Sequence, residues 1–255
     1  MELGGRVALI TGGAGGIGSA VVRGLAKAGA SGIAINYRKS AEPAGWLAKE
    51  MERSGVTAVA VQADVQSDEQ VRSMIDKIHY NFGRLDVLVN NAGVTHWVKV
   101  SDLEGLTDAI WDEIFAVNVK GAFNCARAAA SLLAENDGVI INVSSISGIL
   151  APSTMSSLAY GTAKAALIHL TRGLAVALAP KVRVNCVAPA FTDTPWMSEH
   201  FGAAYRQVID QASEAYPLQR VASPEDIASA IIGLVTGGDF ITGQTLIVDG
   251  GLSLS

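Results

Sequence analysis

The sequence has 255 residues, of which 49% are hydrophobic and 17% charged, and its formal net charge is −5. This balance excludes a disordered tail protein, and the negative charge excludes the basic footprint expected of a nucleic-acid-binding protein. Its two cysteines, Cys125 and Cys186, are far apart and form no C-x-x-C pair, which excludes a disulfide framework or a zinc finger and fits a reducing compartment.

Short β-branched runs alternate along the chain with longer segments of helical spacing. The runs are mostly apolar on both faces, as in strands of a sheet that is covered on both sides. Their alternation predicts a single doubly wound α/β domain over residues 1–255, with a parallel sheet of about seven strands and helices on both faces. The predicted strands are 7–11, 32–36, 58–62, 85–90, 138–144, 182–187 and 245–248, and the predicted helices are 16–28, 42–54, 68–82, 108–135, 158–179 and 224–236.

The first predicted strand leads into a glycine-rich loop and then a helix. Glycines let the backbone approach a pyrophosphate, and the helix N-terminus supplies N–H groups and partial positive charge. This context favours dinucleotide binding over a plain glycine-rich turn. Two registers fit the loop, one with Gly13, Gly15 and Gly18 and the other with Gly12, Gly16 and Gly18, and the loop alone does not choose between them.

The end of the second predicted strand, Ile35-Asn36-Tyr37-Arg38-Lys39, bears on the choice of dinucleotide. NAD sites place an acidic residue here, which binds the ribose 2′-hydroxyl. Asn36 stands in the place of that acid, and Arg38 can pair with a 2′-phosphate in bidentate fashion. NADP(H) is therefore favoured. The alternatives are two solvated surface cations, or the additional use of NAD(H) through a bond from Asn36 to the hydroxyl.

Four later motifs follow in order. Asn90-Asn91-Ala92-Gly93 follows the fourth predicted strand, Asn118-Val119-Lys120-Gly121 lies in a long helix, Asn142-Val143-Ser144-Ser145 ends the fifth strand, and Tyr160-Gly161-Thr162-Ala163-Lys164 begins the next helix. With the first glycine loop, they make the whole chain resemble the classical short-chain dehydrogenase/reductase family, and especially its 3-oxoacyl-[acyl-carrier-protein] reductase-like members. The resemblance implies a Rossmann fold, an oxidoreductase of ketones and secondary alcohols, and the second of the two glycine registers.

The tyrosine and lysine of the last motif share one helix face, because they are four residues apart. A nearby ammonium and a bound, positively charged nicotinamide would lower the pKa of Tyr160, which then exchanges a proton with the carbonyl oxygen. An ordinary surface contact is the alternative for this pair. By resemblance, Ser145 donates a hydrogen bond to the same oxygen, with Ser144 as its rival. Asn118 holds a water on the proton path to Lys164, or else only kinks its helix.

The resemblance also implies the contacts to the cofactor. Asp64 and Val65 are similar to the pair that frames the adenine. The family usually has Pro-Gly after the sixth strand, whereas this chain has Pro189-Ala190. Since alanine tolerates positive φ less well, we expect a stiffer or displaced loop. The expected cofactor contacts are Gly12, Gly16, Ile17, Gly18, Tyr37, Arg38, Asp64, Val65, Asn91, Ala92, Gly93, Tyr160, Lys164, Pro189, Thr192 and Thr194.

Substrate contacts are expected from loops that follow the strands. The strand–helix alternation lapses in residues 190–217, and long irregular insertions are usually lids or binding loops, so a substrate-binding loop is expected there. Residues 150–158 are a second candidate loop. Packing of these side chains onto the core is the alternative interpretation. The individual substrate candidates are His96, Trp97, Phe191 and Trp196.

The substrate class stays open between a small ketone, alcohol or sugar and a 3-oxoacyl thioester. Glu135 and Asp137 precede the fifth strand and would repel an acidic acyl carrier protein, with Arg172 and Lys181 as a partial offset. The small substrate is therefore favoured. The other function classes considered are a non-catalytic dinucleotide-binding regulator and a lyase or epimerase on the same scaffold.

Further expectations concern partners and location. No apolar run reaches the length of a membrane span, and the N-terminal apolar run is shorter than that of a secretory signal, so we expect a cytoplasmic protein with no membrane or nucleic-acid partner. The four histidines show no ligand spacing, and no catalytic metal is expected. The resemblance implies a homotetramer, with segments 108–135, 158–179 and 241–251 suited to subunit contacts.

Overall fold

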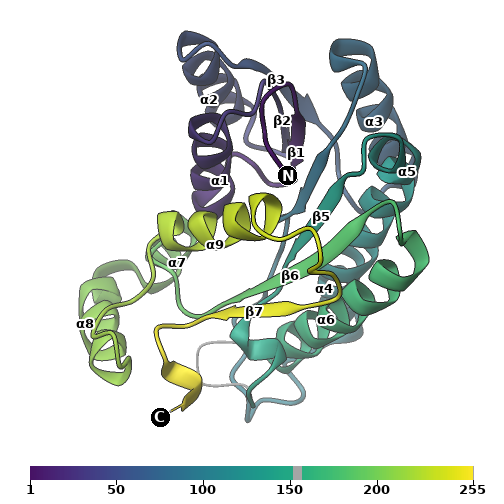
Figure 1. Ribbon diagram of the computed structural model, residues 1–255. Coiled ribbons are helices and arrows are strands. Elements are labelled where there is room, and N and C mark those ends of the chain that lie inside the picture. The colour runs from purple at the N-terminus through teal and green to yellow at the C-terminus, as the bar shows by residue number, and fades with distance from the viewer. Residues whose placement is uncertain (152–156, 255) are drawn as a thin grey trace.

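The computed structural model describes residues 1–151 and 157–254. Its strands form one sheet in the order β3-β2-β1-β4-β5-β6-β7 (Figure 1), and every pairing is parallel. The chain order reverses between β1 and β4, so a crevice forms beyond their carboxyl ends, where doubly wound sheets bind ligands. The strands are β1 Val7–Ile10, β2 Gly32–Tyr37, β3 Thr57–Gln62, β4 Val87–Asn90, β5 Val139–Val143, β6 Arg183–Pro189 and β7 Thr245–Val248.

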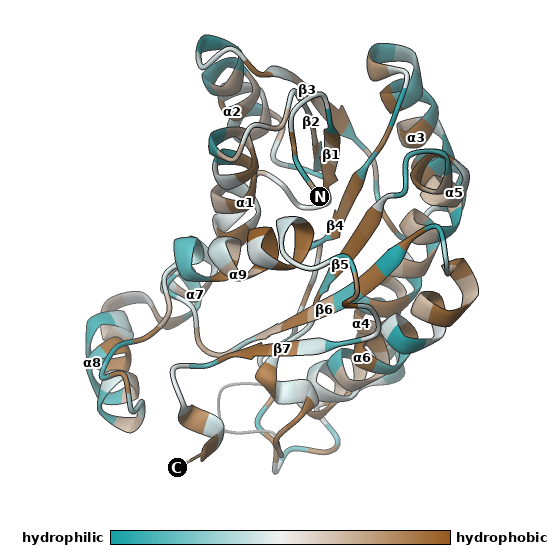
Figure 2. Ribbon diagram, in the orientation of Figure 1, coloured by the Kyte–Doolittle hydropathy of each residue, from teal (hydrophilic) through white to brown (hydrophobic). Residues whose placement is uncertain are grey.

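Helices cover both faces of the sheet, as predicted (Figure 1). Alternate residues of β1 show why its run is apolar throughout: Ala8 and Ile10 pack into the core under α1, α2 and α9, whereas Val7 and Leu9 pack into the core under α3, α5 and α6. The helices are α1 Gly16–Lys27, α2 Ala41–Arg53, α3 Asp68–Phe82, α4 Asp108–Phe115, α5 Ala122–Glu135, α6 Leu158–Leu178, α7 Pro195–Phe201, α8 Tyr205–Ala215 and α9 Pro224–Thr236. Figure 2 shows the resulting apolar sheet between helices with polar outer faces.

Two predicted elements differ from those observed. The predicted helix 108–135 is divided into α4 and α5 by a π-helical turn, Ala116–Gly121, that contains Asn118. Residues 190–217 are not irregular, because they contain α7 and α8 with a short 3₁₀ turn between them. Pro195 occupies the first turn of α7, where its fixed φ and missing N–H favour a helix start.

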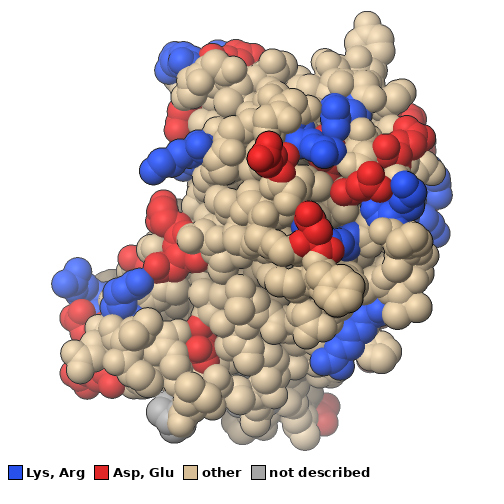
Figure 3. Space-filling view, in the orientation of Figure 1, with Lys and Arg blue, Asp and Glu red and all other residues tan. Residues whose placement is uncertain are grey.

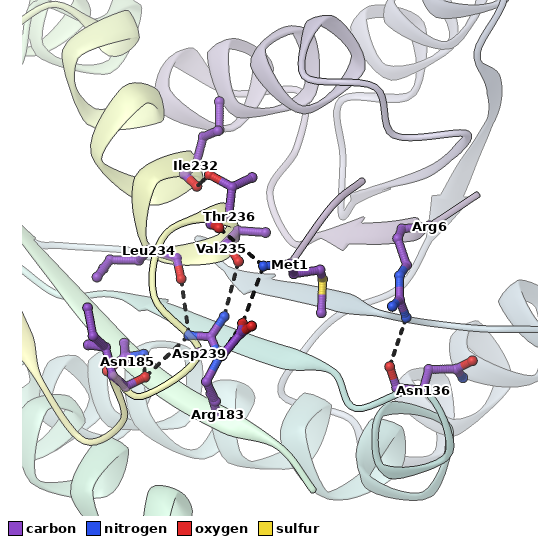
Figure 4. A network of polar contacts seen from close by, with 11 residues as sticks. Met1, Arg6, Asn136, Arg183, Asn185, Ile232, Leu234, Val235, Thr236 and Asp239 are labelled. Atoms are coloured by element: carbon purple, nitrogen blue, oxygen red, sulfur yellow. Dashed lines mark hydrogen bonds and ion pairs between the residues drawn. The ribbon is translucent and has the colours of Figure 1, made fainter. Parts of the chain in front are cut away.

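The carboxyl end of α9 is held against the sheet by two cationic groups, the Arg183 guanidinium and the amino group of Met1 (Figure 4). Arg183 of β6 donates to the carbonyl oxygens of Leu234 (3.2 Å) and Val235 (3.0 Å). The amino group of Met1 donates to the carbonyl of Thr236 (3.1 Å) and pairs with Asp239 (3.3 Å). These contacts satisfy carbonyls that the last turn leaves free and hold α9 against β6, whose opposite end leads into the candidate site.

Candidate active site

The first glycine loop is shaped by close backbone contacts. Gly12 has φ +59°, and a Cβ at this position would lie 3.1 Å from the Cα of Ala92. A Cβ at Gly18 would overlap the carbonyl oxygen of Gly12. Gly15 precedes α1 without a side-chain cap, so the first N–H groups of α1 have no side-chain acceptor. A bare loop and uncapped helix N-terminus fit the pyrophosphate of a dinucleotide.

Asn36 takes a different role from the predicted one. It is only 2% exposed, and its Oδ1 accepts a hydrogen bond from the N–H of Gly12 (3.2 Å) while its Nδ2 donates to the carbonyl of Ala63 (3.0 Å). The N–H of Gly13 also donates to the Asn36 carbonyl (2.9 Å). Asn36 therefore supports the glycine loop from below. The alternative in which its amide bonds a ribose hydroxyl is wrong, because that amide is buried and engaged.

The neighbouring residues of the predicted nucleotide site lie at the carboxyl ends of β2 and β3. Tyr37 is the last residue of β2 and is partly buried. The Arg38 guanidinium lies 3.9 Å from the Asp64 carboxylate, and both side chains remain partly exposed. Val65 is buried, and a Cβ at Gly121 would lie 2.6 Å from it. The structure therefore brings the adenine-side candidates together on one side of the crevice.

The turn after β4 is fastened to the first glycine loop. The Thr11 hydroxyl accepts hydrogen bonds from the N–H groups of Asn91 (2.9 Å) and Ala92 (3.0 Å). The Asn91 side chain donates to the carbonyls of Thr11 (3.0 Å) and Gly12 (3.1 Å). Sequence reasoning missed Thr11, although a polar residue between a buried strand and a glycine loop is a usable signal.

The catalytic candidates meet at the carboxyl ends of β4 and β5. Tyr160 lies in the first turn of α6, where Ser157 accepts a hydrogen bond from its N–H (3.3 Å). Its hydroxyl is hydrogen-bonded to that of Ser145. The Lys164 ammonium lies 5.4 Å from the centre of the Tyr160 ring and donates to the carbonyl of Val143 (2.9 Å). Ser144, the rival of Ser145, points elsewhere and donates to the Lys164 carbonyl (2.7 Å).

The acid–base properties of this pair are set mainly by burial. Burial raises the pKa of Tyr160 to about 12, and the hydrogen bond from Ser145 opposes this increase. Burial also lowers the pKa of Lys164 to about 8. The expected lowering of the Tyr160 pKa is thus not a property of the protein alone, because desolvation outweighs the hydrogen bond and the ammonium is held by the Val143 carbonyl.

Asn118 lies where the π-helical turn widens the helix. Its Nδ2 donates to the carbonyls of Val94 and Ile114 (both 2.8 Å), and its Oδ1 accepts from the N–H of Val94 (3.3 Å). A Cβ at Gly93 would lie 2.9 Å from that oxygen and 3.6 Å from the Lys164 ammonium. Asn118 therefore joins the turn after β4 to the helix and lies close to Lys164. Asn118 thus interrupts the helix and also lies in the candidate site.

The segment after β6 closes over the glycine loop. A Cβ at Gly16 would lie 2.8 Å from the side chain of Thr194. Thr192 forms an isolated bridge with Ala222 and donates to the carbonyl of Ala190 (3.0 Å), while Pro189 ends β6. Ala190 is not among the described residues with positive φ, so replacing the usual glycine does not strain this turn. Ile17, from the predicted set, is partly buried against the core under α1.

Three of the four substrate candidates belong to one aromatic cluster, hereafter the lid cluster: Trp97, Phe191, Trp196, His200 and Phe201. Trp97 stacks on His200 with ring centres 3.9 Å apart and lies 5.6 Å from Trp196. Phe191 meets Phe201 edge to face at 6.3 Å. The lid cluster thus joins the loop after β4 to α7. His200 and Phe201 lie within the predicted substrate loop 190–217 but were not among the individual candidates, because their contacts with Trp97 depend on the fold.

His96 does not join the lid cluster. Its Nε2 lies 2.8 Å from Glu113 of α4, so the ring is engaged away from the aromatic side chains. Of the candidate loop 150–158, residues 152–156 lie outside the described part of the chain. Within the described residues there is no group of three or more His, Cys, Asp or Glu side chains placed to hold a metal ion, and no helix long and apolar enough to cross a membrane.

Comparison with known proteins agrees with this arrangement. Residues 12–253 match the family profile described as "Enoyl-(Acyl carrier protein) reductase". The 3-oxoacyl-[acyl-carrier-protein] reductase FabG of Staphylococcus epidermidis is 36% identical over 248 residues, covering 96% of this chain and 98% of the relative. Nodulation protein G of Azospirillum brasilense is 34% identical, covering 97% of this chain and 98% of the relative.

Solved structures show the same likeness over the whole chain. A gluconate 5-dehydrogenase of Burkholderia cenocepacia, in complex with NADP and tartrate, superposes with a TM-score of 0.88 at 35% identity, covering 100% of this chain and 97% of that one. The NADPH-dependent 3-quinuclidinone reductase of Rhodotorula rubra has a TM-score of 0.88 at 31% identity, with coverage of 100% and 93%. The chain therefore belongs to the short-chain dehydrogenase/reductase family and is an oxidoreductase that acts on CH–OH or keto groups with a nicotinamide dinucleotide.

Proposed function

We propose that this enzyme interconverts a small ketone and its secondary alcohol, or the corresponding groups of a sugar, with a preference for NADP(H). The observation that carries the proposal is the convergence of Tyr160, Ser145 and Lys164 at the carboxyl ends of β4 and β5. This is the edge of a doubly wound sheet at which ligands bind. The nicotinamide cofactor, when bound, supplies or accepts the hydride.

The chain's own residues would handle the proton. Tyr160 is protonated at neutral pH, since burial raises its pKa to about 12, so it can donate a proton to a carbonyl oxygen. Ser145 can donate a hydrogen bond to the same oxygen as negative charge develops on it. Lys164, with a pKa lowered to about 8, can change its charge near neutral pH. It therefore suits the return of a proton towards Tyr160.

The proposed preference for NADP(H) depends on Arg38. Its guanidinium is partly exposed beyond β2, and Asp64 lies 3.9 Å away. A pair this long and this exposed leaves the guanidinium free to bind a phosphate in bidentate fashion. The related gluconate 5-dehydrogenase was solved in complex with NADP, and the related 3-quinuclidinone reductase is NADPH-dependent. These relatives support the preference, while NAD(H) remains the second candidate cofactor.

A small substrate is proposed because of the lid cluster and the surface charge. Trp97 and Trp196 offer apolar area beside the loop after β4. Reduction of 3-oxoacyl thioesters is the second candidate, favoured by the similarity to FabG. That reaction needs exposed cations to dock an acidic carrier. Lys181, however, is paired with Asp137 at 3.1 Å, and on the face in Figure 3 the described residues show both charges interspersed rather than a broad basic patch.

A homotetramer in the cytoplasm completes the proposal. Phe240 is fully exposed, and Leu246 and Ile247 of β7 are about 40% exposed at the edge of the sheet. Phe115 and Phe123, with Leu170 of α6, line an apolar groove on another surface. Two separate apolar surfaces allow two kinds of contact between copies, as a tetramer requires. Light scattering after gel filtration tests this, and a monomer at micromolar concentration would contradict it.

The activity is tested by initial rates of NADPH and NADH oxidation over one panel of carbonyl compounds. The panel contains acetoacetyl thioesters, small diketones, cyclic ketones and keto-sugars, with Tyr160→Phe as the control. The proposal expects turnover of a small ketone with NADPH that the control lacks. Fastest turnover of the thioester would replace the substrate class. Tight binding of NADPH without turnover of any compound would contradict the proposed reaction.

A further inference from the structure

Ser145 belongs to a short segment that is fitted tightly against α6. The segment runs from the end of β5 through a 3₁₀ turn, Ile146–Gly148. The Ser145 hydroxyl accepts from the N–H of Ser147 (3.2 Å) and is hydrogen-bonded to Tyr160. Its place therefore depends on how the whole segment lies on the helix.

Two contacts dock the segment on a single peptide group, the one joining Lys164 to Ala165. On one side of Ser145, the buried Ser144 hydroxyl donates to the Lys164 carbonyl oxygen at 2.7 Å. On the other side, Gly148 lies so close that a Cβ would be 2.6 Å from the Ala165 nitrogen and from the Lys164 carbonyl carbon. Real Cβ atoms do not approach backbone this closely, so the position requires a glycine.

A third contact fixes the same segment at the first turn of α6. A Cβ at Gly161, the residue after Tyr160, would lie 2.8 Å from the carbonyl oxygen of Ser147. Lys164 in turn donates from its ammonium to the carbonyl of Val143, the residue before Ser144. The segment is therefore bound to the helix at points before, beside and after the serine that meets Tyr160.

We propose that Ser144 and Gly148 are positioning residues: they dock the segment on the Lys164–Ala165 peptide group and thereby set the approach of the Ser145 hydroxyl to Tyr160. Neither touches the substrate. The inference rests on the proposed function, because it gives these residues a role only if Ser145 and Tyr160 act together on the carbonyl oxygen. Displacements of about 1 Å of a reacting group can reduce rates about a hundredfold.

The first test is a double-mutant cycle of Ser144→Ala and Ser145→Ala, with kcat and KM measured for the best ketone of the panel. Ser144→Ala is expected to lower kcat about tenfold with an unchanged KM for NADPH. In the Ser145→Ala background, the same change is expected to cost less than about twofold, since its effect passes through Ser145. Equal losses in both backgrounds, or no loss in either, would overturn the proposal.

A glycine series provides the second test. Gly148→Ala is expected to lower kcat about a hundredfold, because its Cβ would force the segment away from α6. Gly173→Ala is the matched control in the same helix, where a Cβ would meet nothing within 4 Å, and it should leave kcat unchanged. Equal rates for the two variants would contradict the proposal.

Two further measurements distinguish a positioning role of Ser144 from a purely structural one, and failure of this inference from failure of the proposed function. The pKa of Tyr160, followed by tyrosinate absorbance, should rise in Ser144→Ala as it does in Ser145→Ala. Both variants weaken the hydrogen bond that lowers this pKa. A purely structural role would lower the melting temperature without this shift. Tyr160→Phe is run alongside: if it keeps full activity, the proposed function fails, whereas its loss together with a fully active Ser144→Ala overturns only the present inference.

Discussion

The two sides of the crevice are built differently. On the nucleotide side, every residue of β1 is buried, and close contacts at Gly12 and Gly18 fix the loop that follows it. On the substrate side, α8 has no fully buried residue, and it lies at the periphery of the molecule (Figure 1). Its neighbour α7 is joined to the rest through partly exposed rings of the lid cluster.

This difference matches two tasks. A dinucleotide is the same ligand in every turnover, so rigid backbone contacts serve it well. Segments with little buried area open at low free-energy cost, which suits the entry and release of a substrate. Variants on the nucleotide side are therefore expected to change cofactor affinity, whereas variants of the lid cluster should change the KM of the carbonyl substrate alone.

Among the effects on ligand binding, the largest is expected for Gly18→Ala. Its Cβ would overlap the Gly12 carbonyl oxygen and displace the phosphate-binding loop. Loss of charge-assisted hydrogen bonds from this loop to the pyrophosphate would weaken NADPH binding at least about a hundredfold, as measured by calorimetry. Gly45→Ala, where a Cβ meets nothing within 4 Å, is the control. A folded Gly18→Ala protein with normal affinity would show that the loop is not the phosphate site.

Arg38→Ala should have the next largest effect and sharpens the cofactor assignment. Removal of the guanidinium is expected to weaken NADPH binding about thirtyfold and leave NADH binding unchanged, since only NADPH carries the 2′-phosphate. Lys39→Ala, at the adjacent cation, should change neither affinity more than about twofold. Unchanged affinity for both cofactors would favour the interpretation of Arg38 as a solvated surface cation, and equal losses for both would contradict a contact that is specific to the 2′-phosphate.

Trp97→Ala tests the substrate side. The stack with His200 would be lost, and the KM of the ketone should rise about tenfold, while the dissociation constant of NADPH stays unchanged. The control is Trp46→Ala, because Trp46 is exposed on α2 outside the lid cluster. A weaker NADPH affinity without a change in the KM of the ketone would contradict the proposed division between the nucleotide side and the substrate side of the crevice.

Lys164 gives an effect of another kind, one on stability that needs no substrate. Burial lowers its pKa from 10.5 to about 8, so the folded protein releases this proton at a lower pH than the unfolded chain does. Burial of the charged lysine therefore lowers the free energy of unfolding. This loss is complete below about pH 8 and disappears as the pH rises towards 10.5. Lys164→Met should therefore be more stable relative to wild type at pH 7 than at pH 10, as measured by urea unfolding. The opposite trend would contradict the sign of the shift.

Sequence predicted the fold well because its signals are local. Buried strands are visible as apolar runs, and the spacing of Tyr160 and Lys164 placed them on one face of a helix. Tertiary contacts explain what was missed. The burial of Asn36 depends on Ala63 of a neighbouring loop, and the π-helical turn depends on bonds from Asn118 to Val94 and Ile114.

The helix α7, within residues 190–217, could have been predicted from its first residues. Thr194 followed by Pro195 is typical of a helix start, yet the lapse of the strand–helix alternation over residues 190–217 suggested an irregular loop. The pKa of Tyr160 was beyond sequence reasoning for another reason. Its direction depends on whether burial or the lysine dominates, and only the position of the Lys164 ammonium on the Val143 carbonyl decides this.

We assign proton transfer to Tyr160 and substrate binding to the lid cluster. Single-turnover stopped-flow measurement of NADPH oxidation at saturating ketone tests this assignment most directly. The account predicts that Tyr160→Phe lowers this rate about a thousandfold with normal NADPH affinity. Trp97→Ala should retain a rate close to that of wild type once the ketone is saturating. A fast single turnover in Tyr160→Phe, or a slow one in Trp97→Ala, would contradict the account.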